Sequence, residues 1–260
     1  MSSELKTERH GSTLVLTLSD PATRNTLSEQ LVSAGVEALN VAEANDELRA
    51  VILRGDGMHF CAGGNLQGLR ARRQSGGPSA QVQMLERLHE FIDAIRVFPK
   101  PVIAAVEGAA AGAGFSLALA CDLVVAAVDA RFILSYARVG LTPDGGATWH
   151  LTRALPRQLV QQLVWLADPI SAQQLHSHGL VNWVTDSGKA FTEALNVAER
   201  LAALAPNAVT GAKELLQQAA SNTLAQQLAA ERDHFIESLF DANAGEGLQA
   251  FFDKRAPRFR

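Results

Sequence analysis

The spacing of apolar residues divides the chain into short strands and longer helices. Short apolar runs bounded by turn residues predict strands at 12–19, 49–55, 101–108, 122–127 and 180–185. Apolar residues at helical spacing predict helices over 26–45 and 82–98. From about residue 189 onward the pattern is only helical. We therefore expect an α/β core followed by a helical C-terminal region.

Three connecting segments have distinctive compositions. RARRQSGGPSA (70–80) combines charges with Gly-Gly-Pro, which predicts an exposed, irregular segment, either a lid over a site or an ordinary surface connection. FCAGGNL (60–66) and GAAAGAGFS (108–116) are glycine-rich turns that each follow a predicted strand. Small residues let a ligand approach the backbone, and free N–H groups favour a negative oxygen. Each turn is therefore either half of an oxyanion site or a place of tight packing.

Composition and charge exclude several classes of protein. The chain has 260 residues, of which 47% are hydrophobic, so we expect one large domain or one domain with a modest appendage. A net charge of −4 gives no reason to expect nucleic-acid or anionic-membrane binding. The apolar stretch 108–121 is too short and glycine-rich to span a bilayer, and the N-terminus has no secretory pattern. We expect a soluble cytoplasmic protein in which Cys61 and Cys121 pack as small hydrophobic residues.

Several apparent motifs fail on inspection. GAGFSL (112–117) has Leu117 where a dinucleotide-binding turn needs its last glycine. Ser116 does not lie in a GxSxG nucleophile motif. His176 and His178 are two residues apart on a predicted helix, so they face different directions and do not form a metal site.

A lone carboxylate lies in RVGLTPDGGATWHL (138–151). Asp144 stands between a proline and two glycines, and the next acid toward the N-terminus is Asp129. It is either the N-cap of the helix that GGATWHLTRAL predicts or a group that carries a proton. Apolar neighbours such as Leu141 and Trp149 would raise its pKa by desolvation. The residues alone leave both interpretations open.

Six segments together resemble the crotonase (enoyl-CoA hydratase/isomerase) superfamily. They occur in the family's order over nearly the whole chain: DPATRNTLS, HFCAGGNL, PVIAAVEGAAAGAGFSLALACDLVVAA, ARFILSYARVGLTPDGGATWHL, ISAQQLHSHGLVNWV and GLQAFFDKRAPRF. The resemblance implies an α/β fold, a ClpP-like spiral of strand–strand–helix units. It implies a crotonase core over 1–195 and, over 196–260, a helical region that builds a homotrimer, often paired into a hexamer.

The resemblance implies an acyl-CoA thioester substrate, with coenzyme A as part of the substrate and no metal or redox cofactor. By position, the backbone N–H groups of Gly64 and Ala113 would hold the enolate oxygen. The family usually has glycine at the second position, and the added methyl group narrows the pocket while keeping the donor. The remaining residues implied for CoA binding are Arg24, Ala62, Leu66 and Lys254. The lysine resembles one that reaches a CoA phosphate across a subunit boundary; the alternative is a solvated helix charge.

The resemblance also indicates which reaction to expect. Hydratases of the family carry two glutamates at the positions of Ser116 and Tyr136, and neither of these side chains is a carboxylate base near neutral pH. Asp144 resembles the acid of family members that move double bonds, and the pattern around it is most similar to the ring-epoxide and enoyl-CoA isomerases of phenylacetate degradation. We therefore expect an acyl-CoA isomerase that shifts a double bond or rearranges a ring.

Three alternatives remain. The first is an enoyl-CoA hydratase in the broad family sense. The second is a halobenzoyl-CoA dehalogenase, in which Asp144 would be the nucleophile and an aromatic residue would lie near Tyr136; its histidine base matches Asp93, with His89 one turn away. The third is a non-catalytic acyl-CoA binder. The acidic balance disfavours an RNA-binding relative.

Overall fold

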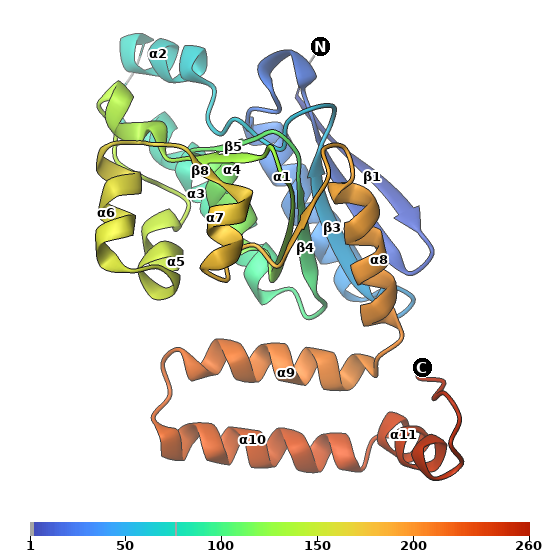
Figure 1. Cartoon of the computed structure of the whole chain (residues 1–260). Helices are drawn as coiled ribbons and strands as arrows, with labels where there is room; N and C mark the ends of the chain where they lie inside the picture. The colour runs from blue at the N-terminus through green and yellow to red at the C-terminus, as the bar shows by residue number, and fades with distance from the viewer. Residues whose placement is uncertain (1–2, 76) are drawn as a thin grey trace.

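The core of the protein is a six-stranded sheet of order β1-β2-β3-β4-β6-β9 (Figure 1). The computed structural model describes residues 3–75 and 77–260. The strands of this sheet are β1 (Glu4–His10), β2 (Thr13–Ser19), β3 (Ala50–Gly55), β4 (Val102–Val106), β6 (Leu123–Ala127) and β9 (Trp183–Thr185). β1 and β2 pair antiparallel, and every other pairing in the sheet is parallel. All five predicted strands are therefore confirmed, and β1 is an addition.

A second, smaller sheet has the order β5-β7-β8. Its strands are β5 (Ala109–Ala111), β7 (Arg131–Ile133) and β8 (Ile170–Ser171). None of them was predicted, because strands of two or three residues are too short to show an alternating pattern. This sheet nevertheless carries the second glycine-rich turn.

The helices cover both faces of the large sheet. They are α1 (Glu29–Glu43), α2 (Leu66–Ser75), α3 (Ser79–Val97), α4 (Ala113–Ala120), α5 (Ala147–Ala154), α6 (Arg157–Trp165), α7 (Ala172–Ser177), α8 (Ala190–Ala202), α9 (Pro206–Ala219), α10 (Leu224–Leu239) and α11 (Ala242–Phe252), with 3₁₀ turns at Pro21–Thr23 and Ser135–Val139. The prediction of an irregular segment over 70–80 is wrong at both ends: helix-favouring Arg, Ala and Gln continue α2 to Ser75, and α3 begins at Ser79. Gly76 lies outside the described residues.

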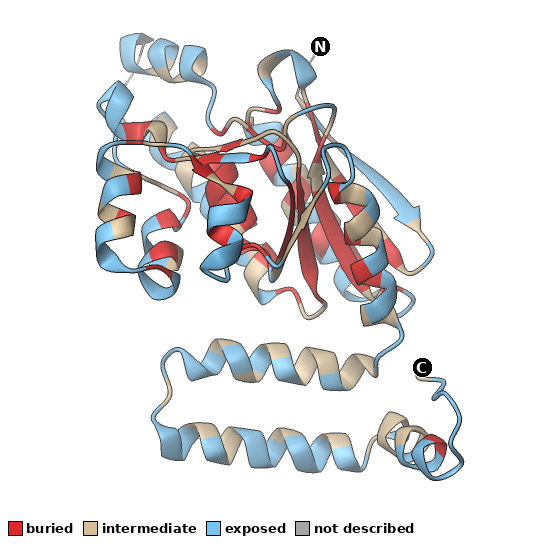
Figure 2. Cartoon of the chain, in the orientation of Figure 1, coloured by how far each residue is buried: buried red, intermediate tan, exposed pale blue. Residues whose placement is uncertain are grey.

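Alternate side chains of the strands point to opposite faces of the sheet. On β2, Leu16 packs in the larger buried cluster with α1, α3 and α4, whereas Val15 packs with α8. Because both faces are covered, β3 and β4 are buried almost throughout (Figure 2). This explains why these strands are continuous apolar runs in the sequence.

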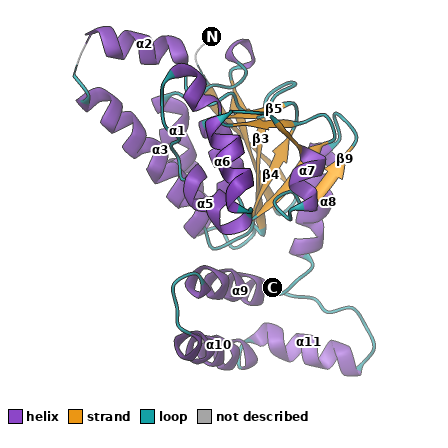
Figure 3. Cartoon of the chain, turned by 60° about the vertical axis from the view of Figure 1, so that its left-hand side comes forward, coloured by secondary structure: helices purple, strands orange, loops and turns teal. Residues whose placement is uncertain are grey.

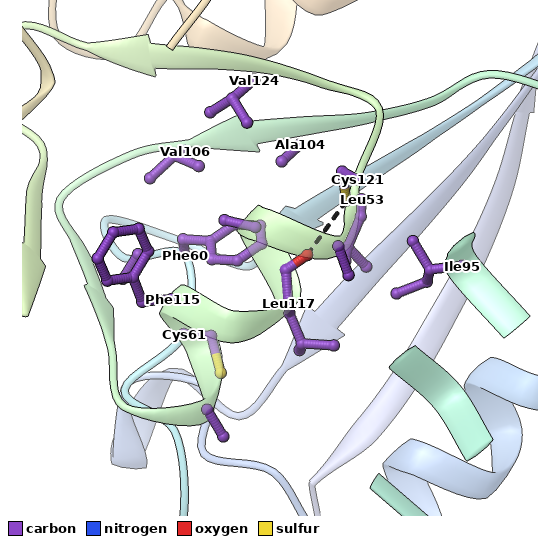
Figure 4. Close-up of a cluster of buried hydrophobic side chains, with 14 of the residues drawn as sticks. Leu53, Phe60, Cys61, Ile95, Ala104, Val106, Phe115, Leu117, Cys121 and Val124 are labelled. Carbon is purple, nitrogen blue, oxygen red and sulfur yellow. Dashed lines mark hydrogen bonds between the residues drawn. The ribbon is translucent and has the colours of Figure 1, made fainter. Parts of the chain in front are cut away.

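The larger cluster encloses both cysteines. Cys61 lies near Phe60 and Phe115, and the Cys121 thiol donates a hydrogen bond to the Leu117 carbonyl (3.3 Å; Figure 4). Burial raises the pKa of the Cys61 thiol to about 12 and also raises the pKa of the Cys121 thiol. Both side chains are therefore protonated packing residues, as predicted.

The last three helices, α9, α10 and α11, lie apart from the sheet (Figures 1 and 3). α8 packs on the sheet as far as Leu201, so the predicted division at residues 195/196 falls inside this helix. The C-terminal region exposes many large apolar side chains: Leu204, Leu216, Leu224, Leu228, Phe235, Ile236, Leu239, Phe240, Leu248, Phe251 and Phe252. Such a surface is typical of one that another chain covers. The trimer or hexamer stays a prediction.

Among the described residues, no helix combines the length and apolar character needed to cross a membrane.

Candidate active site

The fold brings the two glycine-rich turns into contact. The Cys61 N–H donates to the Ala109 carbonyl (3.0 Å), and the Ala111 N–H donates to the Cys61 carbonyl (2.8 Å). A Cβ atom on Gly114 would lie 2.2 Å from the Cys61 carbonyl oxygen, so this close approach requires glycine. The first turn is thus held against β5 and the start of α4.

Both turns contribute a residue to the wall of the same cavity. The cavity has a volume of about 430 Å³, and both Gly64 and Ala113 line it. Neither N–H has a hydrogen-bond acceptor among the described residues. Ala113 is the first residue of α4 and follows Gly112, which has a φ of 53° that favours glycine. Two unpaired donors at the wall of one cavity are the kind of groups that stabilise a negative oxygen.

Asp144 lines this cavity, and a hydrogen bond from a neighbouring side chain positions its carboxylate. Its Oδ1 accepts a hydrogen bond from the Tyr136 hydroxyl (2.6 Å). α5 begins only at Ala147, after Gly145 and Gly146, whose φ angles are 59° and 80°. The interpretation of Asp144 as a helix N-cap is therefore wrong, because two left-handed glycines separate its side chain from the helix, whose N-cap is Gly146.

Ser116 and Tyr136 both serve the loop that contains Asp144. The Ser116 side chain is fully buried, and its hydroxyl donates to the backbone carbonyl of Asp144 (2.9 Å). Tyr136 lies in the 3₁₀ turn Ser135–Val139 and lines the cavity. These two positions therefore fix the backbone and the side chain of Asp144, and Ser116 does not line the cavity.

Burial controls the ionisation of the site. Desolvation raises the pKa of the Asp144 carboxyl, and the hydrogen bond from Tyr136 and the nearby His89 oppose this rise in part. Burial and the neighbouring carboxylate also raise the pKa of the Tyr136 phenol. The proton consequently stays on the phenol. Among the described residues that line the cavity, Asp144 is the only carboxylic acid.

Of the two apolar neighbours predicted for Asp144, only one lies in the cavity. Leu141 lines it. Trp149 instead lines a separate groove between α5 and α9, where the Arg153 guanidinium lies 4.0 Å from its ring centre. The prediction for Trp149 is wrong because α5 directs this side chain away from the cavity.

Replacing Tyr136 with phenylalanine should shift the acidic limb of the pH–rate profile to higher pH. The hydroxyl stabilises the ionised carboxylate, so its loss raises the pKa of Asp144 further, and the basic form is lost sooner as the pH falls. We expect kcat at neutral pH to fall about tenfold, the effect of a charge-assisted hydrogen bond of about 1.5 kcal/mol. Steady-state rates from pH 4 to 9 would show both effects; an unshifted profile would contradict the role of this hydrogen bond.

The residues implied for CoA binding are only partly assembled in one chain. Ala62 and Leu66 line the cavity. Arg24 lies next to Ala62, because the Ala62 N–H donates a hydrogen bond to the Arg24 carbonyl (2.9 Å). The Arg24 residue is exposed. Lys254 follows α11, which lies at the opposite end of the molecule from α2 (Figures 1 and 3). Its contact with CoA would need another chain and stays a prediction.

One buried side chain of the site was missed in the sequence, and one residue that the sequence offered only as a neighbour of Asp93 lines the cavity. The Asn25 side chain is fully buried and donates to the carbonyls of Asp56 (2.9 Å) and His59 (2.8 Å), which joins the first turn to the Arg24 loop. His89, rather than Asp93, lines the cavity on α3. The arginine–asparagine pair before a predicted helix was a signal for the first, because Asn tolerates a positive φ, here 59°.

In the described part of the chain, no group of three or more His, Cys, Asp or Glu side chains is arranged to hold a metal ion.

The fold and the cavity together define a class of protein: an α/β fold in which two backbone donors without a protein acceptor and one half-buried acid line a single cavity. Residues 8–260 match the Enoyl-CoA hydratase/isomerase family. The chain belongs to this family, and its fold is the crotonase fold, as predicted.

Two relatives from Escherichia coli (strain K12) are similar to the chain to nearly the same degree. The 1,2-epoxyphenylacetyl-CoA isomerase is 34% identical over 95% of this chain and 94% of its own. The 2,3-dehydroadipyl-CoA hydratase is 35% identical over 99% of each. A crystal structure of an enoyl-CoA hydratase from Polaromonas sp. JS666 has a TM-score of 0.97 and 56% identity, covering 99% of this chain and 100% of that one.

Proposed function

We propose that the protein is an acyl-CoA isomerase that shifts a double bond, or rearranges a ring, through an enolate of the thioester. One observation carries the proposal: the cavity that holds both unpaired N–H donors contains a single carboxylic acid among the described residues. A single acid suits a reaction that removes a proton and returns it, because no second acid–base group is required.

In the proposed reaction, the thioester oxygen lies between the Gly64 and Ala113 N–H groups. Asp144 removes a proton from one carbon of the enoyl chain, and the electron pair moves into the thioester to form the enolate. The two donors stabilise the developing negative charge. The same carboxyl group then returns the proton to a different carbon, so the double bond has moved and the enzyme is unchanged. No step calls on a metal or redox cofactor.

Water addition is less well supported by the residues present. The two glutamate positions of the family's hydratases hold Ser116 and Tyr136, and here they hold the Asp144 loop in place. The relatives include both an isomerase and a hydratase at similar identity, so the reaction is assigned from the site and not from the degree of similarity.

The test is to incubate the protein with a 3-enoyl-CoA and with a 2-enoyl-CoA in deuterated water, and to follow the products by NMR and mass spectrometry. We expect migration of the double bond and deuterium at the α- and γ-carbons. Water addition faster than migration would overturn the proposal in favour of a hydratase. Binding of CoA thioesters with no exchange of either proton would instead indicate a non-catalytic binder.

One observation favours a second reaction of the same residues. His89 and Asp144 both line the cavity, so an imidazole lies at the same site as the acid. On a halobenzoyl-CoA, Asp144 would displace halide from the ring, and water activated by His89 would then hydrolyse the aryl ester. Release of halide from 4-chlorobenzoyl-CoA, with one oxygen of labelled water entering Asp144, would support this reaction over isomerisation.

A further inference from the structure

A second cavity of about 630 Å³ adjoins the first. The two lie side by side and share five lining residues: Leu66, Leu69, Gln81, Val139 and Leu141. A group bound at Gly64 and Ala113 could therefore extend through the apolar shared part into the second cavity.

The second cavity is lined by three cations. Arg70, Arg72 and Arg73 on α2 all contribute to its wall, and no Asp or Glu does so among the described residues. The Arg72 Nε donates to the Gln81 side chain (2.7 Å), which fixes this arginine across the cavity from α3. Arg70 and Arg73 are one helical turn apart and exposed, so their guanidinium groups can adjust to a ligand.

We propose that the acyl chain of the substrate carries a carboxylate at its far end, and that the α2 arginines bind it. This rests on the proposed function, which places the thioester at the two backbone donors. An apolar passage that ends at three uncompensated guanidinium groups is complementary to an acyl chain that is apolar in the middle and anionic at its tip. Guanidinium groups bind carboxylates through two parallel hydrogen bonds, which gives both affinity and orientation.

The phosphates of CoA are another source of negative charge, but the lining favours the acyl chain. Val139, Gly140 and Leu141 form one wall of the second cavity, and they lead directly to the Asp144 loop. Of the residues implied for the CoA moiety, Arg24 and Ala62 do not line it, and Leu66 lines only the part that it shares with the first cavity. The cavity lined by the arginines therefore adjoins the loop that carries Asp144.

The test compares two unreactive ligands, hexanoyl-CoA and adipoyl-CoA, which differ only in the terminal carboxylate. Calorimetry should show adipoyl-CoA binding the wild-type protein about tenfold more tightly, with a preference that weakens as salt increases. In the double variant Arg70→Gln/Arg73→Gln the preference should disappear, while hexanoyl-CoA binding changes less than about twofold. Arg157→Gln, which removes an exposed charge on α6 outside both cavities, is the matched control and should keep the preference.

Equal affinity of the wild-type protein for the two ligands would overturn the inference. Equal weakening of both ligands and of free CoA in the double variant would overturn it as well, because the arginines would then bind CoA phosphate. The measurement needs no turnover, so a carboxylate preference without double-bond migration would contradict only the proposed isomerase activity.

Discussion

Replacement of Asp144 with asparagine should abolish double-bond migration. Asparagine keeps the size of the side chain but cannot accept the proton, so we expect kcat to fall by about 10³-fold, within the range of 10²–10⁴ for loss of a general base. Binding of unreactive acyl-CoA should persist, since the backbone donors are untouched. Turnover of a 3-enoyl-CoA and calorimetry with hexanoyl-CoA would measure the two effects.

The same variant should be as stable as the wild type, or more stable, at neutral pH. The pKa of Asp144 is raised above its ordinary value, so the folded protein holds this proton more tightly than the unfolded chain does. The stability due to this group is therefore highest below the unfolded pKa and is lost as the pH rises through the folded one. Asparagine does not ionise, so the variant does not lose this stability as the pH rises. Thermal denaturation at pH 5 and pH 7.5 would compare the melting temperatures of the variant and the wild type.

Asp93→Asn provides a matched control for both measurements. Asp93 is exposed on α3 and does not line the cavity, so the same chemical change there should leave kcat unaltered. Substantial migration by the Asp144 variant would contradict the single-acid mechanism. A strong fall in its melting temperature would attribute the lost activity to unfolding.

Replacement of Ala113 with proline should reduce kcat by about 10²–10³-fold, or about 3–4 kcal/mol in transition-state stabilisation. Proline has no N–H, and its ring occupies the place where this donor meets the thioester oxygen. Ala113 is the first residue of α4, the helical position at which proline is best tolerated, so the helix should still form. Steady-state kinetics with a 3-enoyl-CoA would measure the loss.

The variant Ala113→Gly distinguishes the effect of the backbone N–H from that of the side-chain methyl group. Glycine keeps the N–H and removes only the methyl group, so this variant should retain most of the wild-type kcat and admit bulkier acyl groups. If both variants lose activity equally, the position would be sensitive to any substitution, and the loss in the proline variant would not be evidence for the N–H donor. Circular dichroism of the proline variant would check that the fold is intact.

The sequence by itself determined the main strands and the type of chemistry. β3 and β4 are continuous apolar runs because both faces of a parallel sheet are covered, and that pattern is local enough to recognise. The family resemblance identified the two glycine-rich turns and the acid of the 138–151 segment. These features depend on residue type, on order along the chain and on short-range periodicity.

The tertiary structure decided how those parts meet. Cys61 and Ala111 are hydrogen-bonded although fifty residues separate them, and no local pattern specifies such a contact. The direction of the Asp144 side chain depends on two left-handed glycines and on a tyrosine from another turn. His89 and Asp93 lie on nearly the same face of α3, so which of them reaches the cavity depends on where along its length the helix passes it. Non-local packing sets each of these, and a one-dimensional pattern does not contain it.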